Sequence, residues 1–157
     1  MLRIFAGFLA SAFLFAGTAF AERVLRVADG DTIVVRGADG GTLRVRLWGI
    51  DDPERDQPFG DAARDRLRAL ISGKDVRLDV CDRDAYGRTV AVVFLGDEDV
   101  CLRQIEEGFA WHYRRYAPHA LAYAAAEKRA RAERRGLWAD ADPVPPWEWR
   151  RRKSRRK

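Results

Sequence analysis

Five short segments with the character of β-strands, interrupted once by a helix, limit the folds that this chain can adopt. The strand-like segments are residues 24–27, 32–35, 42–47, 75–80 and 89–95. In the third segment apolar residues occupy one face and Arg44 and Arg46 the other, the alternation of a half-buried strand. Residues 60–72 instead place apolar residues at helical spacing, and Gly73 follows as a stop. This order predicts a small closed barrel, and the OB architecture fits it.

Two further helices are expected beyond the barrel strands, over residues 100–107 and 117–135. Gly108 and Gly136 stand where these helices would end. We expect residues 137–138 to fold back onto the core. The expected fold class is therefore mainly β with α, an α+β domain built on a five-stranded OB barrel with about three flanking helices.

The N-terminus has the composition of a targeting segment rather than of a folded domain. Arg3 supplies a positive start, residues 4–15 are largely apolar, and Ala19-Phe20-Ala21 resembles a signal-peptidase site. We expect residues 1–21 to be a signal peptide, the mature chain to begin at Glu22, and the protein to be exported to a periplasm or beyond. The apolar stretch is short for a membrane span, and an uncleaved anchor is the alternative.

The C-terminus differs from the single domain expected over residues 22–139. Residues 140–149 hold three prolines and two tryptophans, which predicts an extended strap rather than a helix. Residues 150–157 hold seven basic residues and no hydrophobes, and are expected to be disordered unless bound. Residues 22–149 carry 21 basic and 24 acidic residues, so the basic excess lies in the tail. Nucleic acid is its expected partner, with an anionic membrane surface or a solubilising role as alternatives.

Export also affects the interpretation of the cysteines, Cys81 and Cys101, which are the only two. An oxidising compartment favours a disulfide between them, and two small buried hydrophobes are the alternative. His112 and His119 stand alone, so no Cys/His cluster has the spacing of a zinc site.

Two acidic turns offer oxygen ligands instead. One is Asp29-Gly30-Asp31-Thr32, and the other is Asp51-Asp52-Pro53-Glu54. Taken alone, each could be an ordinary capped turn or a charged loop. However, three carboxylates within four residues repel one another unless a cation or arginines offset them. Hard divalent cations such as calcium prefer carboxylate and carbonyl oxygens.

Two arginines complete the pattern. Arg46 leaves a predicted strand on the face opposite its apolar row, and Arg88 closes the segment Asp84-Ala85-Tyr86-Gly87-Arg88. Guanidinium groups match phosphate oxygens in a bidentate manner and stay charged, which suits the charge that builds up during phosphodiester hydrolysis. Surface salt bridges are the alternative for either arginine alone. Beside the acidic turns, the pair predicts a site that cuts phosphodiester bonds.

These three charged clusters, in this order and spacing, resemble those of the staphylococcal nuclease (thermonuclease) family, and the resemblance covers residues 24–138. The family's OB barrel with three helices agrees with the strand order above. The resemblance implies a calcium-dependent nuclease acting on DNA or RNA with little sequence specificity and leaving 3′-phosphate ends. No dimer seam is visible, so a monomer is expected.

The resemblance also assigns roles to individual residues. It implies the metal ligands Asp31, Asp51 and Asp52, the catalytic residues Arg46, Glu54 and Arg88, and the substrate-binding residues Tyr86, Tyr113 and Tyr116. Glu54 matches the proposed general base. Asp52 provides a backbone carbonyl where the family usually has threonine or alanine; its extra carboxylate could tighten ion binding, alter ion preference or point to solvent.

The aromatic and basic residues around Tyr113 and Tyr116 suit stacking on bases and contact with phosphates, whereas Trp111 is expected to belong mainly to the core. Two other functions compete with the nuclease. One is a non-catalytic nucleic-acid-binding module on the same fold, and the other is an OB-type protein that binds a different anion. The presence of both acidic turns together with both arginines favours the nuclease.

Overall fold

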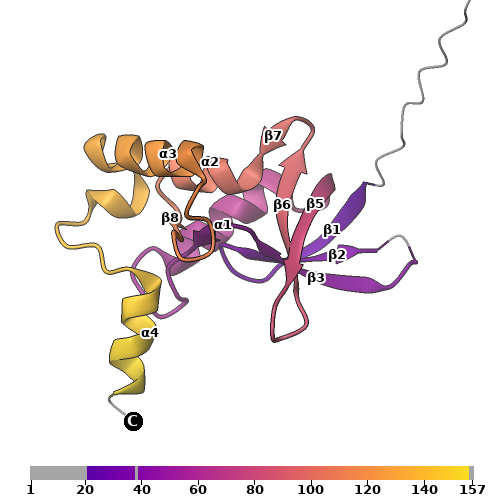
Figure 1. The fold of residues 1–157 in the computed structure, drawn as a ribbon, viewed down its shortest axis with the longest axis horizontal. Helices are drawn as coiled ribbons and strands as arrows, with labels where there is room; N and C mark the ends of the chain where they lie inside the picture. The colour runs from indigo at the N-terminus through magenta and orange to yellow at the C-terminus, as the bar shows by residue number, and fades with distance from the viewer. Residues whose placement is uncertain (1–20, 38, 156–157) are drawn as a thin grey trace, which may run out of the picture.

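Five strands close into a barrel in the computed structural model, which describes residues 21–37 and 39–155 (Figure 1). The barrel strands are β1 (Glu22–Val27), β2 (Thr32–Arg36), β3 (Thr42–Leu47), β5 (Asp75–Arg83) and β6 (Thr89–Leu95). Their order in the sheet is β3-β2-β1-β5-β6, and a parallel pairing of β3 with β6 closes it. The expected barrel is therefore confirmed, and β7 (Glu98–Asp99) extends it beside β6.

The alternation in the sequence decides which face of each strand is buried. Ile33 of β2 lies opposite Val45 of β3, and both side chains are fully buried in the barrel. Irregularities in register interrupt β1 between Val24 and Arg26 and β5 between Val80 and Asp82. Bulges of this kind bend a strand and increase its twist, which helps a small sheet to close.

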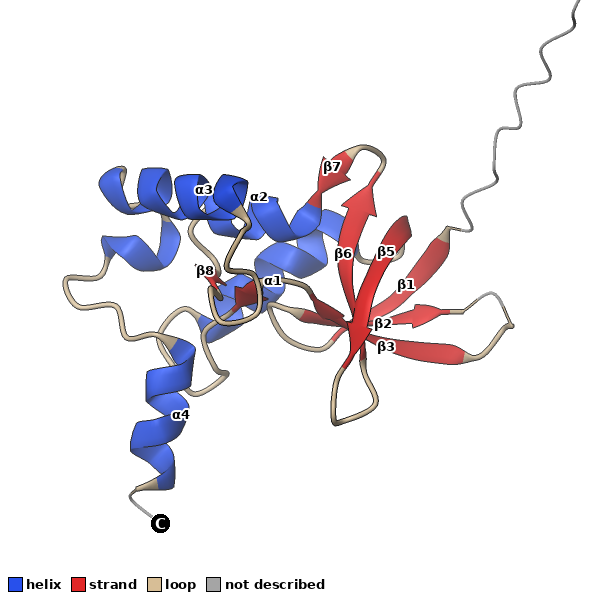
Figure 2. Ribbon diagram, viewed as in Figure 1, coloured by secondary structure: helices blue, strands red, loops and turns tan. Residues whose placement is uncertain are grey.

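The helices lie mainly on one side of the barrel (Figure 2). They are α1 (Gly60–Ile71), α2 (Val100–Glu106), α3 (Leu121–Ala132), the 3-10 helix η1 (Gly136–Ala139) and α4 (Pro146–Ser154). Helix α1 buries the predicted apolar stripe against the barrel, and Asp99 caps α2 by accepting a hydrogen bond from the Leu102 amide. Helix α3 begins later than predicted, because Pro118 disfavours helical backbone in the residue before it.

A second, two-stranded sheet links the barrel to the helices. It pairs β4 (Ile50–Asp51) with β8 (Trp111–His112) in antiparallel register. Asp51 therefore lies on a paired strand opposite Trp111 rather than in a free loop. Trp111 is buried, as expected, and packs with Leu137 and Trp138 in a second apolar cluster.

Two glycines allow the chain to turn back onto this second cluster. A Cβ atom on Gly136 would lie 2.2 Å from the carbonyl oxygen of Gly108, and one on Gly108 would lie 2.2 Å from that of Arg135. Both glycines also have positive φ, which other residues rarely adopt. This close approach of two backbones brings Leu137 and Trp138 into the core, as the sequence predicted.

The expectations for the C-terminal segment were wrong. The chain is extended only as far as Pro145 and then forms α4, which includes most of the residues expected to be disordered. Pro146 begins the helix, at the one position where proline suits a helix because its fixed φ is already helical. Figure 1 shows α4 apart from α1, α2 and α3, on the same side of the molecule as the loop between β5 and β6.

The expected disulfide is also wrong. Cys81 is exposed on β5, whereas Cys101 is buried in α2 with its sulfur facing the carbonyl of Ala91 on β6, and both are free. Burial raises the pKa of the Cys101 thiol to about 12, so that it behaves as a small core residue.

The expected signal peptide lies almost wholly outside the described residues. Within residues 21–37 and 39–155, none of the helices combines the length and the apolar character that crossing a membrane requires.

Candidate active site

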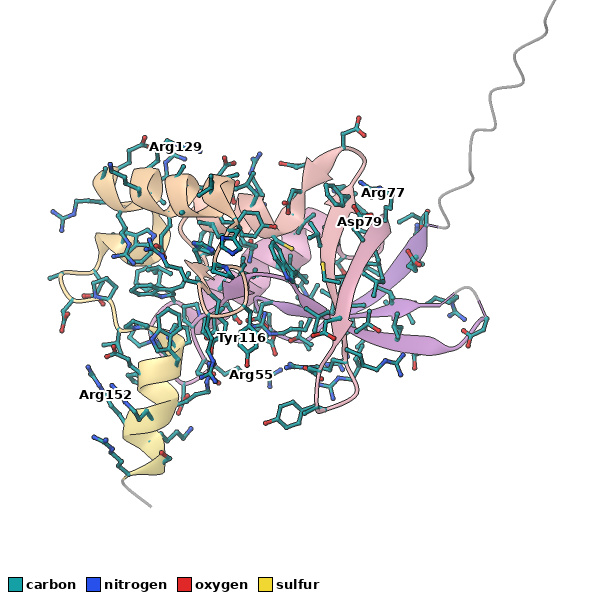
Figure 3. All side chains as sticks on the ribbon, viewed as in Figure 1. Arg55, Arg77, Asp79, Tyr116, Arg129 and Arg152 are labelled. Atoms are coloured by element: carbon teal, nitrogen blue, oxygen red, sulfur yellow. The ribbon has the colours of Figure 1, made fainter. Side chains whose placement is uncertain are left out.

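All nine residues assigned to the site line one cleft of about 1020 Å³. The barrel supplies its floor, the loop between β5 and β6 one wall, and α4 contributes Arg150 and Lys153. Figure 3 shows Arg55 and Tyr116, which also line this cleft, between the barrel and α4. The structure thus gathers residues that are far apart in the sequence into one cavity.

The floor of the cleft holds Asp31 and Asp51, whose exposed fractions are only 5% and 2%. Asp31 immediately precedes β2 and Asp51 ends β4, so both are held by strands. Arg46, on β3, connects them: its Nη2 atom lies 2.9 Å from Asp31 Oδ2 and 3.1 Å from Asp51 Oδ1. The face of β3 opposite the apolar row therefore points into the cleft.

The two aspartates differ in their electrostatic surroundings. Burial alone would raise the pKa of Asp31, but Arg46 and hydrogen bonds from Asp52 and Thr32 hold this pKa below its ordinary value. Burial and the negative charge of Asp31 raise the pKa of Asp51, whereas hydrogen bonds from Arg150 lower it, and the net effect is a raised pKa. Asp31 is therefore the more firmly ionised of the pair.

Asp52 links the two acidic turns. Its carboxylate accepts a hydrogen bond of 2.7 Å from the Gly30 amide, while its own amide donates to Asp31 Oδ2 at 3.1 Å. A Cβ atom on Gly30 would lie 2.5 Å from Asp52 Oδ2, so glycine is required for this approach. The side chain is buried and does not point to solvent, which removes one of the three possibilities raised by the sequence.

Asp29 also belongs to the acidic cluster, although the resemblance assigns it no role. Oxygen atoms of Asp29, Asp31 and Asp52 all lie within 4.8 Å of one another. Burial and the charge of Asp31 raise the pKa of Asp29 to about 6, and the same two effects raise the pKa of Asp52 well above its usual value. The position of Asp29 two residues before Asp31 was the signal available in the sequence.

Glu54 lies at the edge of the cleft, just beyond Pro53. Its Oε1 atom accepts a hydrogen bond of 2.7 Å from Nη1 of Arg150 on α4. The same guanidinium group donates through Nη2 to Asp51 Oδ2 at 2.8 Å. Sequence reasoning missed Arg150 as a site residue, because its basic surroundings indicated only a disordered tail.

Arg88 and Tyr86 come from the turn between β5 and β6. Arg88 Nε donates to Asp84 Oδ2 at 2.6 Å, and its guanidinium carbon lies 5.6 Å from the centre of the Tyr86 ring. Asp84 also accepts hydrogen bonds from the amides of Tyr86 and Arg88, so its carboxylate holds the turn. With 84% of Tyr86 exposed, this arm presents an aromatic face and a cation to the cleft.

The opposite side of the cleft carries Tyr113 and Tyr116, whose ring centres are 5.0 Å apart. Tyr116 is exposed, and Tyr113 stacks on Trp147 of α4 with their ring planes only 4° from parallel. An exposed aromatic ring beside arginines can stack on a nucleobase. Helix α4 therefore contacts both the acidic and the aromatic parts of the site.

The sequence model of the family described as staphylococcal nuclease homologue matches residues 44–140, more than half of the chain. The chain belongs to the staphylococcal nuclease family. A Haemophilus influenzae protein named as an uncharacterized endonuclease is 39% identical over 129 residues, covering 82% of this chain and 72% of that protein. An Escherichia coli protein of the same name is 42% identical over 132 residues, covering 83% and 85%.

A micrococcal nuclease of Shigella flexneri is 40% identical over 142 residues, covering 84% of this chain and 81% of its own length. The expected family, fold class and enzyme class, a nuclease and therefore a hydrolase, are confirmed. The roles of the nine site residues stay predictions, now placed in one cavity.

The donor atoms of the acidic cluster fit a hard divalent cation. The predicted ligands Asp31, Asp51 and Asp52 share two members with the spatial cluster of Asp29, Asp31 and Asp52. All four carboxylates offer oxygen, and the raised pKa values of Asp29 and Asp52 show that their negative charges are poorly compensated. A cation bound here would offset these negative charges.

Proposed function

We propose that this protein is a calcium-dependent nuclease that hydrolyses phosphodiester bonds of DNA or RNA with little sequence preference. The observation that carries the proposal is the single cleft in which Arg46 connects the two predicted calcium ligands, Asp31 and Asp51, with Glu54 and Arg88 around them. We also propose that the protein acts as a monomer and is exported after removal of residues 1–21.

The chain's own residues divide the proposed reaction between them. Arg46 and Arg88 hold the phosphate oxygens and stabilise the charge that builds up on them in the transition state. Glu54 positions a water molecule and accepts a proton as the water oxygen bonds to phosphorus. The bond from phosphorus to the 5′ oxygen then breaks, and this oxygen takes up a proton from solvent, leaving a 3′-phosphate and a 5′-hydroxyl. A calcium ion held by Asp31, Asp51 and Asp52 would supply positive charge that makes phosphorus more electrophilic.

Substrate contacts follow from the two walls of the cleft. Tyr86 beside Arg88 contacts a phosphate, and Tyr113 and Tyr116 stack on bases. None of these groups distinguishes one base from another, because every base has an aromatic face. Weak sequence preference is the consequence.

Incubating the purified protein with single-stranded DNA, in calcium or in EGTA, tests this proposal. Cleavage is expected in calcium but not in EGTA, with products that carry 3′-phosphate ends. Glu54→Gln is expected to lower kcat by roughly 10²–10⁴-fold, the usual contribution of a general base, with little change in DNA affinity. Glu133→Gln makes the same chemical change at the exposed end of α3 and serves as the control.

Absence of cleavage in both calcium and EGTA would replace the enzyme by a nucleic-acid-binding module on the same fold. Unchanged turnover in Glu54→Gln would remove Glu54 from the chemistry while leaving the nuclease itself intact. Export is tested separately, by mass spectrometry of protein recovered outside the cytoplasm, where an N-terminus at Glu22 is expected.

A further inference from the structure

Arg150 occupies the carboxylates that the proposed function assigns to the cation and to the water. Its Nη2 atom is 2.8 Å from Asp51 Oδ2, and its Nη1 atom is 3.3 Å from Asp51 Oδ1 and 2.7 Å from Glu54 Oε1. Arg46 also donates a hydrogen bond to Asp51 Oδ1, so both oxygens of Asp51 have cationic partners. Asp51 is thus fully engaged, by two arginines that come from distant parts of the chain.

Such an arrangement conflicts with cation binding through Asp51. Calcium lies about 2.3–2.6 Å from its ligand oxygens. A calcium ion and the Arg150 guanidinium on the same carboxylate would therefore be within a few ångströms of each other, both positively charged and partly shielded from water. Arg46 also pairs with Asp31 Oδ2 and Asp51 Oδ1, but it leaves Asp51 Oδ2 free. Arg150 is the group that occupies this last oxygen, and it contacts the expected base as well.

Helix α4 is held over the cleft by contacts at the surface and, in its first turn, by the packing of Trp147 against Trp111. Trp149 Nε1 donates to Asp56 at 3.2 Å, Lys153 pairs with the same carboxylate, and Trp147 stacks on Tyr113. Exposed ion pairs typically contribute only about 0–1 kcal/mol each. The Arg150 side chain itself is 45% exposed, so it can return to water when another cation takes its place on Asp51.

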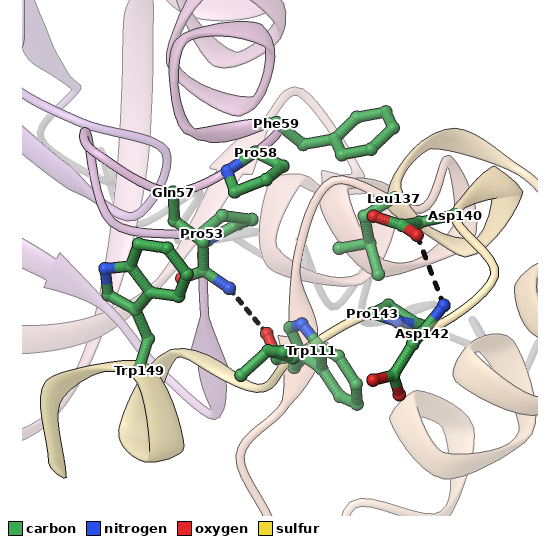
Figure 4. Close-up of a pocket in the computed structure, with 11 residues that line it drawn as sticks. Pro53, Gln57, Pro58, Phe59, Trp111, Leu137, Asp140, Asp142, Pro143 and Trp149 are labelled. Carbon is green, nitrogen blue, oxygen red and sulfur yellow. Dashed lines mark hydrogen bonds between the residues drawn. The ribbon is translucent and has the colours of Figure 1, made fainter. Parts of the chain in front are cut away.

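The segment before α4 and the first turn of the helix are anchored more firmly than the part of the helix that carries Arg150 and Lys153. Gln57 donates a hydrogen bond to the carbonyl of Val144, and Val144 lines a small pocket of about 60 Å³ with Trp111, Leu137 and Trp149 (Figure 4). Gln57, Trp111 and Leu137 are buried in the body of the protein. A firm attachment from Val144 to Trp149, followed by a part of α4 that is held by the ion pairs of Arg150 and Lys153, has the layout of a lid on a hinge.

We infer that α4 is a lid whose Arg150 holds the cation-binding carboxylates in the cation-free protein, so that a divalent cation must displace it. The inference rests on the proposed function, because that function supplies the ligand role of Asp51. In the closed state Arg150 neutralises Asp51 and Glu54 and covers the cleft. When a cation takes Asp51, α4 is released, and its basic side chains become free to contact the phosphates of a bound strand.

A lid of this kind lowers the apparent affinity for the cation. When only a fraction of the molecules is open, the apparent Kd equals the intrinsic Kd divided by that fraction. Removing the hydrogen bonds of Arg150 should raise the open fraction. Hydrogen bonds to charged groups typically contribute enough for about a tenfold change in an equilibrium constant.

Calcium titration by calorimetry, without nucleic acid, tests the competition directly. Arg150→Gln is expected to lower the calcium Kd by about tenfold relative to the unmodified chain. Arg152→Gln is the matched control, because it makes the same change on the same helix. Its side chain pairs with Glu148 within α4 and, in Figure 3, lies on the side of α4 away from the barrel. The control is expected to leave the calcium Kd unchanged.

Hydrogen exchange gives a second measurement on the unmodified protein. Amides of α4 are expected to exchange faster in calcium than in EGTA, whereas those of α1 exchange at the same rate in both. In Arg150→Gln the amides of α4 should already exchange fast in EGTA. These readouts do not depend on turnover.

The outcomes separate the lid from the nuclease. Equal calcium affinities for Arg150→Gln and the unmodified chain, or weaker binding by the variant, overturn the lid while leaving calcium-dependent cleavage untouched. If neither protein binds calcium, the calcium site of the proposed function is wrong and the lid is wrong with it. Exchange in α4 that does not respond to calcium also contradicts the lid.

Discussion

Asp29 shows how a single partly buried carboxylate can make stability depend on pH. Its pKa is raised to about 6 by burial and by the charge of Asp31, from an ordinary value of 3.8. The folded state therefore holds a proton that the unfolded state releases at lower pH. It follows that this side chain contributes most favourably below its ordinary pKa, and that stability is lost as the pH rises through about 6.

Replacing Asp29 by asparagine should remove this loss of stability at higher pH. The variant keeps an oxygen that can accept the hydrogen bond which Asp29 Oδ1 receives from the Asp31 amide. We expect Asp29→Asn, in EGTA, to raise the free energy of unfolding by up to about 3 kcal/mol near pH 8 and by about half as much near pH 5. Urea unfolding at the two pH values measures the difference.

Asp39→Asn is the control for that measurement. Asp39 Oδ1 also accepts a hydrogen bond from the amide two residues later, but its side chain is exposed and lies in the turn between β2 and β3. The control should change little at either pH. A gain in Asp29→Asn that is the same at both pH values would show that charge on Asp29 is not its cause.

Among single residues, those in compact local motifs were predictable and the others were not. Asp31, Asp51 and Glu54 stand in short acidic turns beside strands, so their type and position indicated a site. Asp29 differs, because its raised pKa depends first on burial, which the folded structure imposes and no local pattern reveals. Arg150 was out of reach, since its partners lie 96 and 99 residues earlier in the chain.

At the scale of elements, the turn between β5 and β6 acts as a support for Arg88. Asp84 holds it through hydrogen bonds to backbone amides and through its ion pair with the Arg88 guanidinium. Burial alone would raise the pKa of Asp84, but the hydrogen bonds from Arg88 and Tyr86 keep it below its ordinary value. The carboxylate therefore stays ionised, and the ion pair persists, throughout the neutral pH range.

Asp84→Ala should release this arm without disturbing the acidic floor. We expect kcat/KM on single-stranded DNA to fall by about tenfold or more, because Arg88 is no longer held where phosphate charge develops. The calcium Kd should not change, since Asp84 makes no contact with Asp31 or Asp51. Asp97→Ala, in the exposed turn between β6 and β7, is the control. Higher activity in Asp84→Ala would mean that Asp84 competes with substrate for Arg88.

Elements defined by local periodicity were predicted well, whereas α4 was not. Helix α1 and the strands follow apolar spacing that the sequence displays directly. In α4 the prolines and the run of basic residues argue locally against a helix. Its stability comes from outside the segment, through the stacking of Trp147 on Tyr113 and the pairing of Arg150 with Asp51 and Glu54.

At the scale of the whole molecule, the charge distribution has a different meaning from the one the sequence suggested. The sequence places an acidic excess in residues 22–149 and a basic excess in residues 150–157, for which nucleic acid was the expected partner. In the folded protein the basic segment lies on the acidic cleft through Arg150 and Lys153. The acidic cleft and the basic segment therefore partly neutralise each other. In the proposed lid, a cation replaces the basic segment in the cleft, and a nucleic acid replaces the acidic cleft as the partner of the basic segment.

Removing residues 150–157 should consequently move two affinities in opposite directions. Calcium should bind more tightly, because Arg150 no longer occupies Asp51. Single-stranded DNA, measured by fluorescence anisotropy in EGTA to prevent cleavage, should bind more weakly at low salt. The slope of log affinity against log salt should become shallower by about 0.7 for each phosphate that the shortened protein no longer neutralises.

A chain that lacks only residues 155–157 is the control for this deletion, because α4 ends at Ser154 and Arg150 is retained. It should lose part of the salt dependence of DNA binding while its calcium Kd stays that of the full chain. Unchanged DNA affinity after removal of residues 150–157 would mean that the basic segment pairs with the acidic cleft but does not bind DNA. Weaker binding of both calcium and DNA would instead show that α4 supports the site rather than covering it.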